Sequence, residues 1–474
     1  MAVAFVLPSS AHEQDLSQRD KNPYLDVPEI SGGVGFLSQQ QEKAIGERML
    51  RAVRKQLPVI EDAWLEQEIA GIFGHIYSQT NLGQPLATVI VGDQQINAFA
   101  VPGGMFAINA GVITSSKNID EVAGVIAHEV AHVSQRHYSR SREAMRGQTL
   151  LSLLGMMAGV ALASQTSDAG AAVMLGSQVA LMDKRLTYSR NQEREADRVG
   201  MQYMSIAGYN PISMADFFET MHRSTTSVSY LPEFWLTHPL TSERMSESRL
   251  RARQFPVAHP TSDQQQSFEM IRWRVAVLSD YADINQLKTL ASRNVGAALA
   301  LATHYIRQSK FTAAKQILDQ VKPNSVQEKL YALTWADYYA GQGQSVQALE
   351  VILPHYLIAP ENKVLALAMA NAYRINKQSQ KALDILRPLS VKHPTDPKVW
   401  QALYQNELIR DYPLKDIYVL MYKAELQFWT GDEEAALITL LHANRLVDRQ
   451  SNELVKAKVK ARLAEMQEAR HFKV

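Results

Sequence analysis

The stretch His128-Glu129-Val130-Ala131-His132 (HEVAH) lies in an apolar, helix-forming part of a 474-residue chain. Two histidines four residues apart project from the same face of a helix, so both imidazoles can bind one metal ion. The glutamate between them lies beside the water that such a metal activates. This is the HExxH zinc-hydrolase pattern, which predicts His128 and His132 as metal ligands and Glu129 as the general base.

A third ligand has to come from outside this stretch. The longer HExxHxxGxxH pattern fails, because Gln135 stands at the glycine position and Tyr138 at the third histidine. His137 follows His128 by nine residues, which places it on the opposite face if the helix continues. We therefore exclude His137 as a ligand.

The segment 191–200 (NQEREADRVG) offers the missing ligand. On a helix, Glu193 and Asp197 share one face with Gly200, whose small size allows close approach to the HEVAH helix. We predict that Glu193 binds the metal and that Asp197 accepts the second N–H of a ligating histidine, which fixes the imidazole tautomer. Glu195 points about 200° away and is expected to be solvated or paired with an arginine. The alternative, a charged surface face, would leave the HExxH pair without a third ligand.

A further histidine, His238, is followed by Pro239 and, six residues on, by Arg244. We assign His238 a candidate catalytic role, stabilising the oxyanion that forms during peptide cleavage. Two alternatives remain open. His238 binds the open metal position and holds the enzyme inactive, or it is a structural residue.

The residues before HEVAH predict two helices and a small sheet. Apolar residues recur at helical spacing between 39 and 78, with Pro58 as the interruption. Residues 87–113 are β-branched and aromatic with Gly/Pro turns, which predicts two or three strands. An exposed edge strand there would bind an extended substrate peptide; a purely structural sheet is the alternative. Asn118 and Glu121 form a capping-box pattern at the start of the HEVAH helix.

An apolar stretch rich in Met, Gly and Ala covers residues 148–182. Its two runs are each shorter than the roughly 20 residues that a bilayer crossing needs. We interpret it as a helical hairpin beside the active site that acts as a mobile lid. Contact with a membrane is the alternative interpretation.

The C-terminal half repeats itself with a period of 34 residues. Tyrosines at 305, 339 and 373, and alanines at 302, 336 and 370 and at 314, 348 and 382, keep this interval. This spacing is typical of tetratricopeptide repeats, which bind peptides or partner proteins on a concave surface. A fourth unit near Gly431 is displaced by 20 residues, which predicts an insertion near residues 411–418. A final capping helix is expected from Asn452 to about Ala469.

Composition limits the remaining possibilities. The net charge of +1 gives no bulk attraction to nucleic acid or to an anionic membrane. The chain has no cysteine, so His, Asp and Glu must supply every metal ligand. Residues 2–7 form a short apolar run before small residues, which we interpret as a truncated signal peptide. A frayed apolar terminus is the alternative.

Together these features predict a mainly α protein. An α+β zincin-like metallopeptidase domain with a small β-sheet is followed by an α-solenoid of tetratricopeptide repeats. The expected segments are a signal peptide over 1–11, an extended lead-in over 12–38, the peptidase domain over 39–253, a linker over 254–266 and the repeat domain over 267–474.

HEVAH, the EREAD segment (193–197) and the His238-Pro239…Arg244 element resemble the zinc endopeptidases that include HtpX and the CAAX prenyl proteases. With the C-terminal repeats, the arrangement resembles the bacterial beta-barrel assembly-enhancing proteases. The resemblance implies one Zn²⁺ bound by His128, His132 and Glu193. It implies Glu129 as the base, with Asp197 as a supporting residue or proton donor.

The resemblance further implies a soluble periplasmic enzyme that degrades misassembled outer-membrane proteins and assists their assembly. Its partners would be unfolded substrates and, through the repeats, the outer-membrane assembly machinery, with peripheral membrane contact possible and no nucleic acid. Two rival hypotheses remain. One is a repeat-based chaperone or scaffold whose peptidase site is latched or vestigial, and the other is a membrane-embedded peptidase.

Overall fold

The computed structural model describes residues 37–138, 140, 190–226, 238–449 and 452–472. The predicted signal segment, most of the lead-in and the apolar stretch 148–182 lie outside the described residues. Within the described ranges, no helix combines the length and the apolar character that a bilayer crossing requires.

Two helices open the described chain, as predicted. Helix α1 (Gln39–Gln56) begins with a capping box, in which the Ser38 side chain accepts the Gln41 N–H and the Gln41 side chain accepts the Ser38 N–H. Helix α2 (Ala63–Tyr77) begins at the N-cap Asp62. Such caps satisfy backbone N–H groups that lack partners in the first helical turn. Pro58 lies in the connection between the helices.

Strands β1 (Ala87–Val91), β2 (Ala98–Val101) and β3 (Met105–Asn109) form a sheet with the order β1-β3-β2. Strand β3 pairs parallel to β1 and antiparallel to β2. The prediction of strand up to residue 113 was wrong at its end, because Ala110–Ser115 form the short helix α3. A buried helical turn and a buried strand share the same continuous apolar sequence, so periodicity alone does not separate them.

The HEVAH segment lies on helix α4 (Ile119–Ser134), which begins at the N-cap Asn118. Helix α4 packs between the sheet and the helices α8 (Arg190–Ile206), α9 (Ile212–Thr226) and α11 (Ser242–Ala252). The predicted close approach of α8 is present. A Cβ added at Gly200 would lie 3.1 Å from the carbonyl carbon and oxygen of Ala127.

The C-terminal half is entirely helical where it is described. Helix α12 starts at Ser262, so the prediction of a linker up to residue 266 was wrong at its end. The Thr261 side chain caps this helix, and polar residues such as those at 262–266 are common in a first helical turn. The helices are α12 (Ser262–Leu278), α13 (Ile284–Leu290), α14 (Val295–Arg307), α15 (Phe311–Leu318), α16 (Glu328–Gly341), α17 (Ser345–Ile358), α18 (Lys363–Ile375), α19 (Ser379–Lys392), α20 (Pro397–Leu408), α21 (Lys415–Trp429), α22 (Glu433–Val447) and α23 (Glu453–His471).

The 34-residue period corresponds to pairs of helices. The repeated tyrosines lie on α14, α16 and α18, and the repeated alanines 314, 348 and 382 lie buried on α15, α17 and α19. The fourth predicted repeat unit, near Gly431, is displaced by 20 residues, and the cause is not the expected insertion near residues 411–418. Helix α20, Pro397–Leu408, precedes residues 411–418 and supplies most of the additional chain. The fold is thus the predicted one, a small α+β domain followed by helical repeats.

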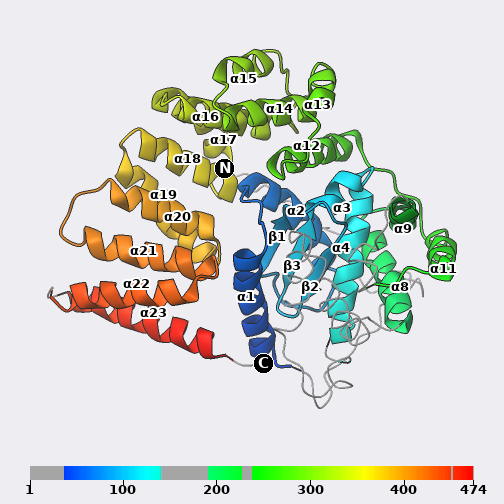
Figure 1. Ribbon diagram of the computed structural model, residues 1–474, viewed down its shortest axis with the longest axis horizontal. Coiled ribbons are helices and arrows are strands. Elements are labelled where there is room, and N and C mark those ends of the chain that lie inside the picture. Colours follow the sequence, from blue (N-terminus) through cyan, green and yellow to red (C-terminus); the bar gives the residue numbers. More distant parts are fainter. Residues whose placement is uncertain (1–36, 139, 141–189, 227–237, 450–451, 473–474) are drawn as a thin grey trace, which may run out of the picture.

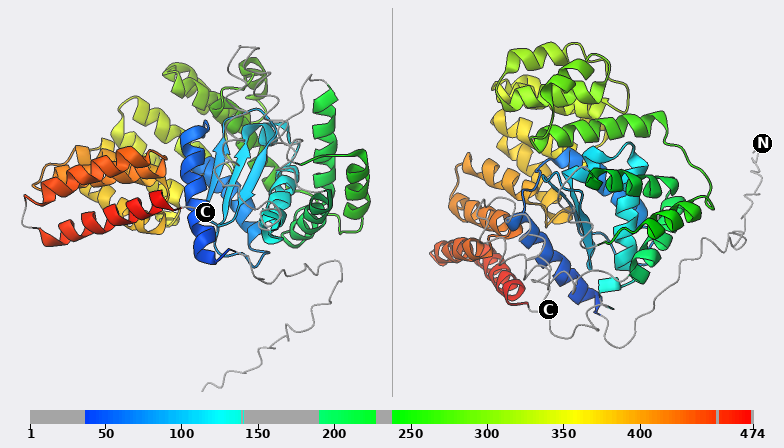
Figure 2. Two further views of the ribbon diagram at one scale, coloured as in Figure 1. Left: turned by 60° about the horizontal axis from the view of Figure 1, so that its bottom comes forward. Right: turned by 45° about the vertical axis from the view of Figure 1, so that its right-hand side comes forward.

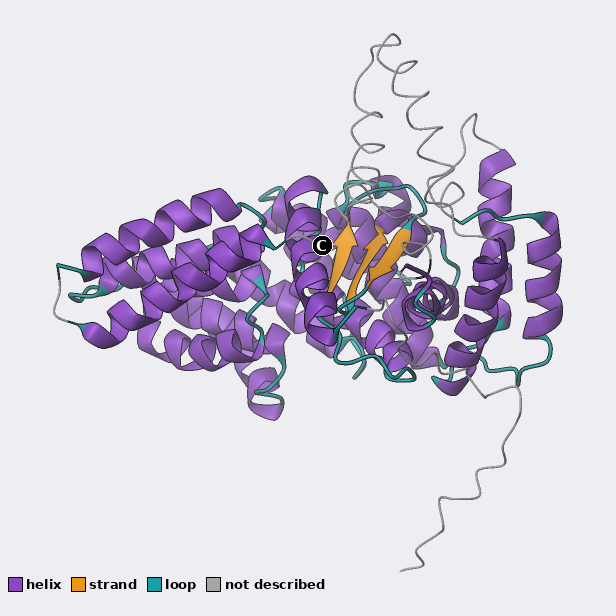
Figure 3. Cartoon of the chain, turned by 90° about the horizontal axis from the view of Figure 1, so that it is seen from below, coloured by secondary structure: helices purple, strands orange, loops and turns teal. Residues whose placement is uncertain are grey.

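Figures 1 and 2 show that α12 to α23, here called the repeat array, curve around the α+β domain with α1 on their inner side. Figure 3 shows the three strands near the middle of the molecule, with helices on both sides of them. The apolar face of α1 shares one hydrophobic core with α21, α22 and α23. Polar contacts reinforce this junction. The Arg51 Nε atom lies 2.7 Å from Glu433, and Arg54 donates to the Thr395 carbonyl at 2.7 Å.

The tightest contact at this junction gives a test of its importance. Gly431 has a φ of +89°, and a Cβ there would lie 2.2 Å from the Arg51 carbonyl oxygen on α1. Gly431→Ala should therefore lower the melting temperature more than Gly343→Ala, a control with φ +72° and nothing within 4 Å of the added Cβ. The control loses about 1–2 kcal/mol for its left-handed backbone, whereas Gly431→Ala loses roughly 1–3 kcal/mol more from the collision. Equal losses in thermal denaturation would contradict a tight junction.

Candidate metal centre

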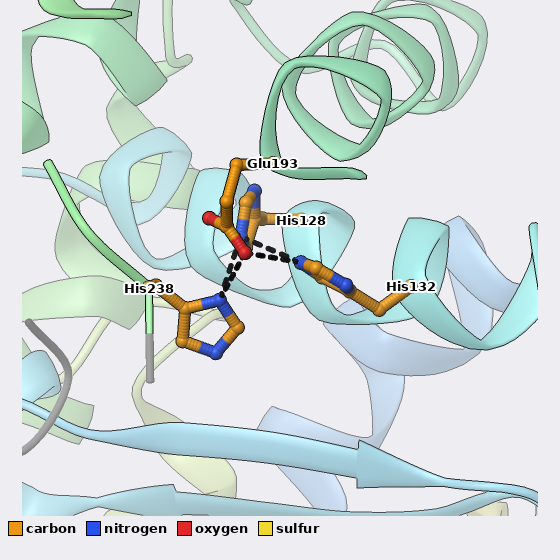
Figure 4. A group of neighbouring side chains, drawn as sticks. All are labelled: His128, His132, Glu193 and His238. Carbon is orange, nitrogen blue, oxygen red and sulfur yellow. Dashed lines mark hydrogen bonds and ion pairs between the residues drawn. The ribbon is translucent and has the colours of Figure 1, made fainter. Parts of the chain in front are cut away.

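Four side chains converge on one point from three parts of the chain (Figure 4). His128 and His132 come from α4, Glu193 comes from α8, and His238 comes from the segment just before α11. One ligand atom of each lies within 4.8 Å of the other three, and all four residues are buried. The structure therefore brings together the three residues predicted as metal ligands and the histidine for which two site roles were open.

The distances describe a compact donor set. The Nε2 atoms of His128 and His132 lie 3.0 Å apart. Glu193 Oε1 lies 3.4 Å from His132 Nε2 and 3.0 Å from His238 Nδ1. His238 Nδ1 is also 3.4 Å from His128 Nε2. Three nitrogens and one carboxylate oxygen thus face a common centre.

Asp197 contacts His128 through the ring nitrogen that faces away from the donor set. Its Oδ1 atom lies 3.0 Å from His128 Nδ1, as the spacing on α8 predicted. Asp197 is itself held by Arg244, whose Nε and Nη2 atoms donate at 2.7 and 2.8 Å, and by Ser248 Oγ at 3.2 Å. Arg244 also contacts Glu193 Oε2 through Nη1 at 2.6 Å. One buried arginine therefore orients both functional carboxylates of α8.

These contacts shift the pKa values of the carboxylates. Burial alone would raise the pKa of Asp197, but Arg244 outweighs it and lowers that pKa to about 2. Burial also opposes ionisation of Glu193, yet the charges of His238 and Arg244 hold its pKa well below the ordinary value. Both carboxylates are therefore ionised at neutral pH, as a ligand and its supporting residue need to be.

The donor chemistry fits a divalent cation. Because the Asp197 carboxylate accepts the Nδ1 proton of His128, the Nε2 atom of neutral His128 presents a lone pair toward His132 Nε2 and Glu193. Burial lowers the pKa of His128, but the bonds to Asp197 and Glu193 outweigh it and raise that pKa to about 9. The two carboxylates therefore favour positive charge at this position, supplied by a proton or by a metal ion. Histidine nitrogens and a carboxylate oxygen are ligands that zinc commonly takes.

Glu129 lies beside this donor set and is not part of it. Its Oε1 atom is 3.6 Å from His238 Nε2, and its carboxylate accepts the backbone N–H of Ala100 on β2. Burial raises the pKa of Glu129, although the charges of His238 and His128 oppose that change. A buried carboxylate with a raised pKa is a stronger proton acceptor than a solvated one.

His137 and Glu195 make a contact with each other that the sequence did not indicate. His137 does not lie on a continuation of the HEVAH helix, because α4 ends at Ser134 and Arg136 takes a left-handed φ of +53°. His137 is outside the cluster of candidate ligands, but it turns back so that its Nδ1 atom lies 2.9 Å from Nδ1 of His132. Glu195 pairs with Arg140 at 3.0 Å, which confirms the expected arginine partner, and also with His137 at 3.0 Å.

The contacts of Arg244 and Ser248 with Asp197 were not predicted from the sequence. Both residues lie on α11, and both contact Asp197 on α8, which is 47 and 51 residues earlier in the sequence. Helical spacing reports which residues share one helix face, but it does not report which helices pack together. For Arg244, the one signal in the sequence was its place in the His238-Pro239…Arg244 element.

Comparison with known proteins agrees with this geometry. Residues 60–252 match peptidase family M48, and this range contains every residue of the donor set and Glu129. This part of the chain is therefore similar to the metallopeptidases of family M48.

The chain is also similar to individual members of related groups. It is 29% identical over 335 residues to the beta-barrel assembly-enhancing protease of Yersinia pestis, covering 68% of each chain. It is 31% identical over 230 residues to the protein of that name from Escherichia coli strain K12, covering 48% of this chain and 47% of the relative. A more distant relative, 27% identical over 191 residues, is the mitochondrial metalloendopeptidase OMA1 of Schizosaccharomyces pombe. The match thus spans about two thirds of the Yersinia relative and about half of the Escherichia one.

Proposed function

We propose that this chain is a zinc-dependent endopeptidase that cleaves unfolded or misassembled outer-membrane proteins in the bacterial periplasm. The observation that supports the reaction is the buried group of His128, His132 and Glu193 with Glu129 beside it. The names of the Yersinia and Escherichia relatives refer to beta-barrel assembly, which supports outer-membrane proteins as the class of substrate.

Each site residue is proposed to have a separate role in peptide hydrolysis. When bound by His128, His132 and Glu193, zinc supplies a Lewis acid that polarises a carbonyl group and activates water. Glu129 takes a proton from the attacking water and delivers it to the leaving amine. Asp197 keeps the Nδ1 proton on His128, so that Nε2 of this histidine remains available as a donor.

The sheet offers a way to align the substrate. The Ala100 N–H points to Glu129 on α4, so the edge of β2 that does not pair with β3 faces the site. An extended peptide that pairs with this edge would lie across the metal centre with its backbone carbonyls near Glu129. This supports β2 as the substrate-binding edge that the sequence suggested.

The repeat array is proposed to select substrates and to contact the outer-membrane assembly machinery. Helical repeats supply an extended surface for protein partners and carry no catalytic groups of their own. The inner side of the array near α21 to α23 is occupied by α1 of the same chain. Partner binding is therefore proposed for the remaining surface of the array.

The test of this function combines metal analysis with a cleavage assay. The purified protein is expected to contain one zinc per chain and to degrade casein, an unfolded model substrate, in a manner that chelation abolishes and added Zn²⁺ restores. One bound zinc with no cleavage under any condition would instead favour the rival hypothesis of a chaperone or scaffold with a latched peptidase site.

We further propose that His238 is a fourth ligand that holds the described state inactive. Its Nδ1 atom faces the same centre as the three other donors, at 3.0 Å from Glu193 Oε1. His238→Ala should therefore raise the rate of casein cleavage several-fold, because the open position becomes available to water. The exposed His75→Ala is the control and should leave the rate unchanged. A fall of about 10²-fold or more for His238→Ala would assign it to oxyanion stabilisation instead.

A further inference from the structure

A chain of polar contacts leads away from His132 on the side opposite the donor set. Nδ1 of His132 lies 2.9 Å from Nδ1 of His137. The other nitrogen of His137, Nε2, lies 3.0 Å from Glu195 Oε2. Glu195 is in turn 3.0 Å from Arg140 Nη1. His137 is fully buried, whereas the Glu195 side chain is 25% exposed and the Arg140 side chain 42% exposed.

The backbone makes an unusual turn to build this contact. Helix α4 ends at Ser134, and Arg136 adopts a left-handed φ of +53°, which side chains other than glycine take up at a cost. A continued helix would carry residue 137 to the face opposite His128. The turn instead places His137 beside Nδ1 of His132, the ring nitrogen that faces away from the donor set. Strained backbone of this kind is concentrated at functional sites.

The arrangement of protons follows from the partners. A carboxylate only accepts hydrogen bonds, so His137 donates to Glu195 from Nε2. Neutral His137 then has a lone pair on Nδ1, and His132 must donate its Nδ1–H to it. The Nε2 atom of His132 is left with its lone pair directed at the donor set, 3.0 Å from His128 Nε2. The reverse arrangement would put a proton on His132 Nε2 and prevent it from binding a metal.

We infer that His137 and Glu195 are positioning residues that fix the ring orientation and tautomer of His132 as a metal ligand. This inference rests on the proposed metal site. Both ligating histidines of α4 would then be held through Nδ1 by a carboxylate of α8. Asp197 holds the Nδ1–H of His128 directly, while Glu195, two residues earlier on α8, holds that of His132 through an intervening imidazole. Groups that support a ligating histidine in this way typically change metal affinity 10–100-fold when they are removed.

The test measures metal binding directly. His137→Phe, which keeps a ring but removes the acceptor, and Glu195→Ala should each weaken Zn²⁺ binding about 10–100-fold in competition with a chromophoric chelator. Glu195→Gln retains an oxygen that accepts from His137 and should restore wild-type affinity to within about threefold. The cobalt-substituted His137→Phe protein should also show an altered visible d–d spectrum, because the His132 ring is no longer held.

A matched control separates positioning from general packing. Tyr203 donates from its hydroxyl to Ser134 Oγ at 2.9 Å, at the same end of α4, so Tyr203→Phe disturbs this region without touching His137 or Glu195. It should lower the melting temperature while leaving the Zn²⁺ dissociation constant unchanged. The inference is overturned if both His137→Phe and Glu195→Ala bind Zn²⁺ within twofold of the wild type. A wild-type protein that binds no Zn²⁺ would overturn the proposed function itself.

Discussion

Glu129→Gln is expected to lower kcat/KM for an unfolded protein substrate by about 10²–10⁴-fold, the usual contribution of a general base. The amide has nearly the same size as the carboxylate but cannot take a proton from water. Because Glu129 lies outside the donor set of His128, His132, Glu193 and His238, the variant should still contain one zinc per chain. Metal analysis and a fluorogenic cleavage assay on the same preparation check both parts of this expectation.

Glu121→Gln provides the matched control for this change. Glu121 is a second buried glutamate of α4, and its Oε2 atom accepts the Lys117 N–H at 2.8 Å, away from the metal centre. Its amide counterpart should retain activity within about twofold. If Glu129→Gln cleaves at the wild-type rate with zinc bound, Glu129 is not the base.

Arg244→Leu is expected to destabilise the metal-free protein by about 3–5 kcal/mol, the usual cost of breaking a buried ion pair. The arginine lies between Asp197 and Glu193, and its loss leaves both carboxylates buried without a cationic partner. Arg249→Leu on the same helix is the control. Arg249 is 29% exposed and pairs with Asp216 at the surface, so its loss should cost at most about 1 kcal/mol. Guanidinium chloride unfolding of the chelated proteins measures the difference, and equal midpoints for both variants would refute it.

The same contact has a defined pH dependence. The pKa of Asp197 is lowered from its ordinary value to about 2, so the stability it contributes is present above about pH 4 and lost as the pH falls toward 2. The difference between the wild type and Arg244→Leu should therefore be constant near neutral pH and shrink below pH 4. Acid unfolding of the two chelated proteins measures this convergence.

Much of the candidate site could be predicted because its residues lie on two helices with a regular period. His128 and His132 share a face of α4, and Glu193 and Asp197 share a face of α8, so spacing alone grouped them correctly. The contacts of Arg244 with these carboxylates could not be predicted, because they depend on how α11 packs against α8. The return of His137 was also missed, since it depends on a left-handed residue at Arg136 that no pattern in the sequence indicated.

The fold shows the same division. The two N-terminal helices, the sheet and the helical repeats followed from periodicity and capping residues. The short helix α3 and the start of α12 at Ser262 differed from prediction, because apolar and polar runs of these lengths are compatible with more than one backbone conformation. The position of α1 against the far end of the repeat array depends on contacts between residues hundreds of positions apart, which no local pattern contains.

That position of α1 has a consequence for how the molecule is made. Arg48 on α1 donates to the carbonyl of Phe472, a partner 424 residues later in the chain. At a synthesis rate of roughly 5–20 residues per second, the interval between the two is on the order of 20–80 seconds. During that interval the apolar face of α1 has its partners on the sheet but lacks those on α21, α22 and α23. Helix α1 is therefore among the last of the described helices to complete its native environment, and a chain that stops short of α21 to α23 leaves part of its apolar face uncovered.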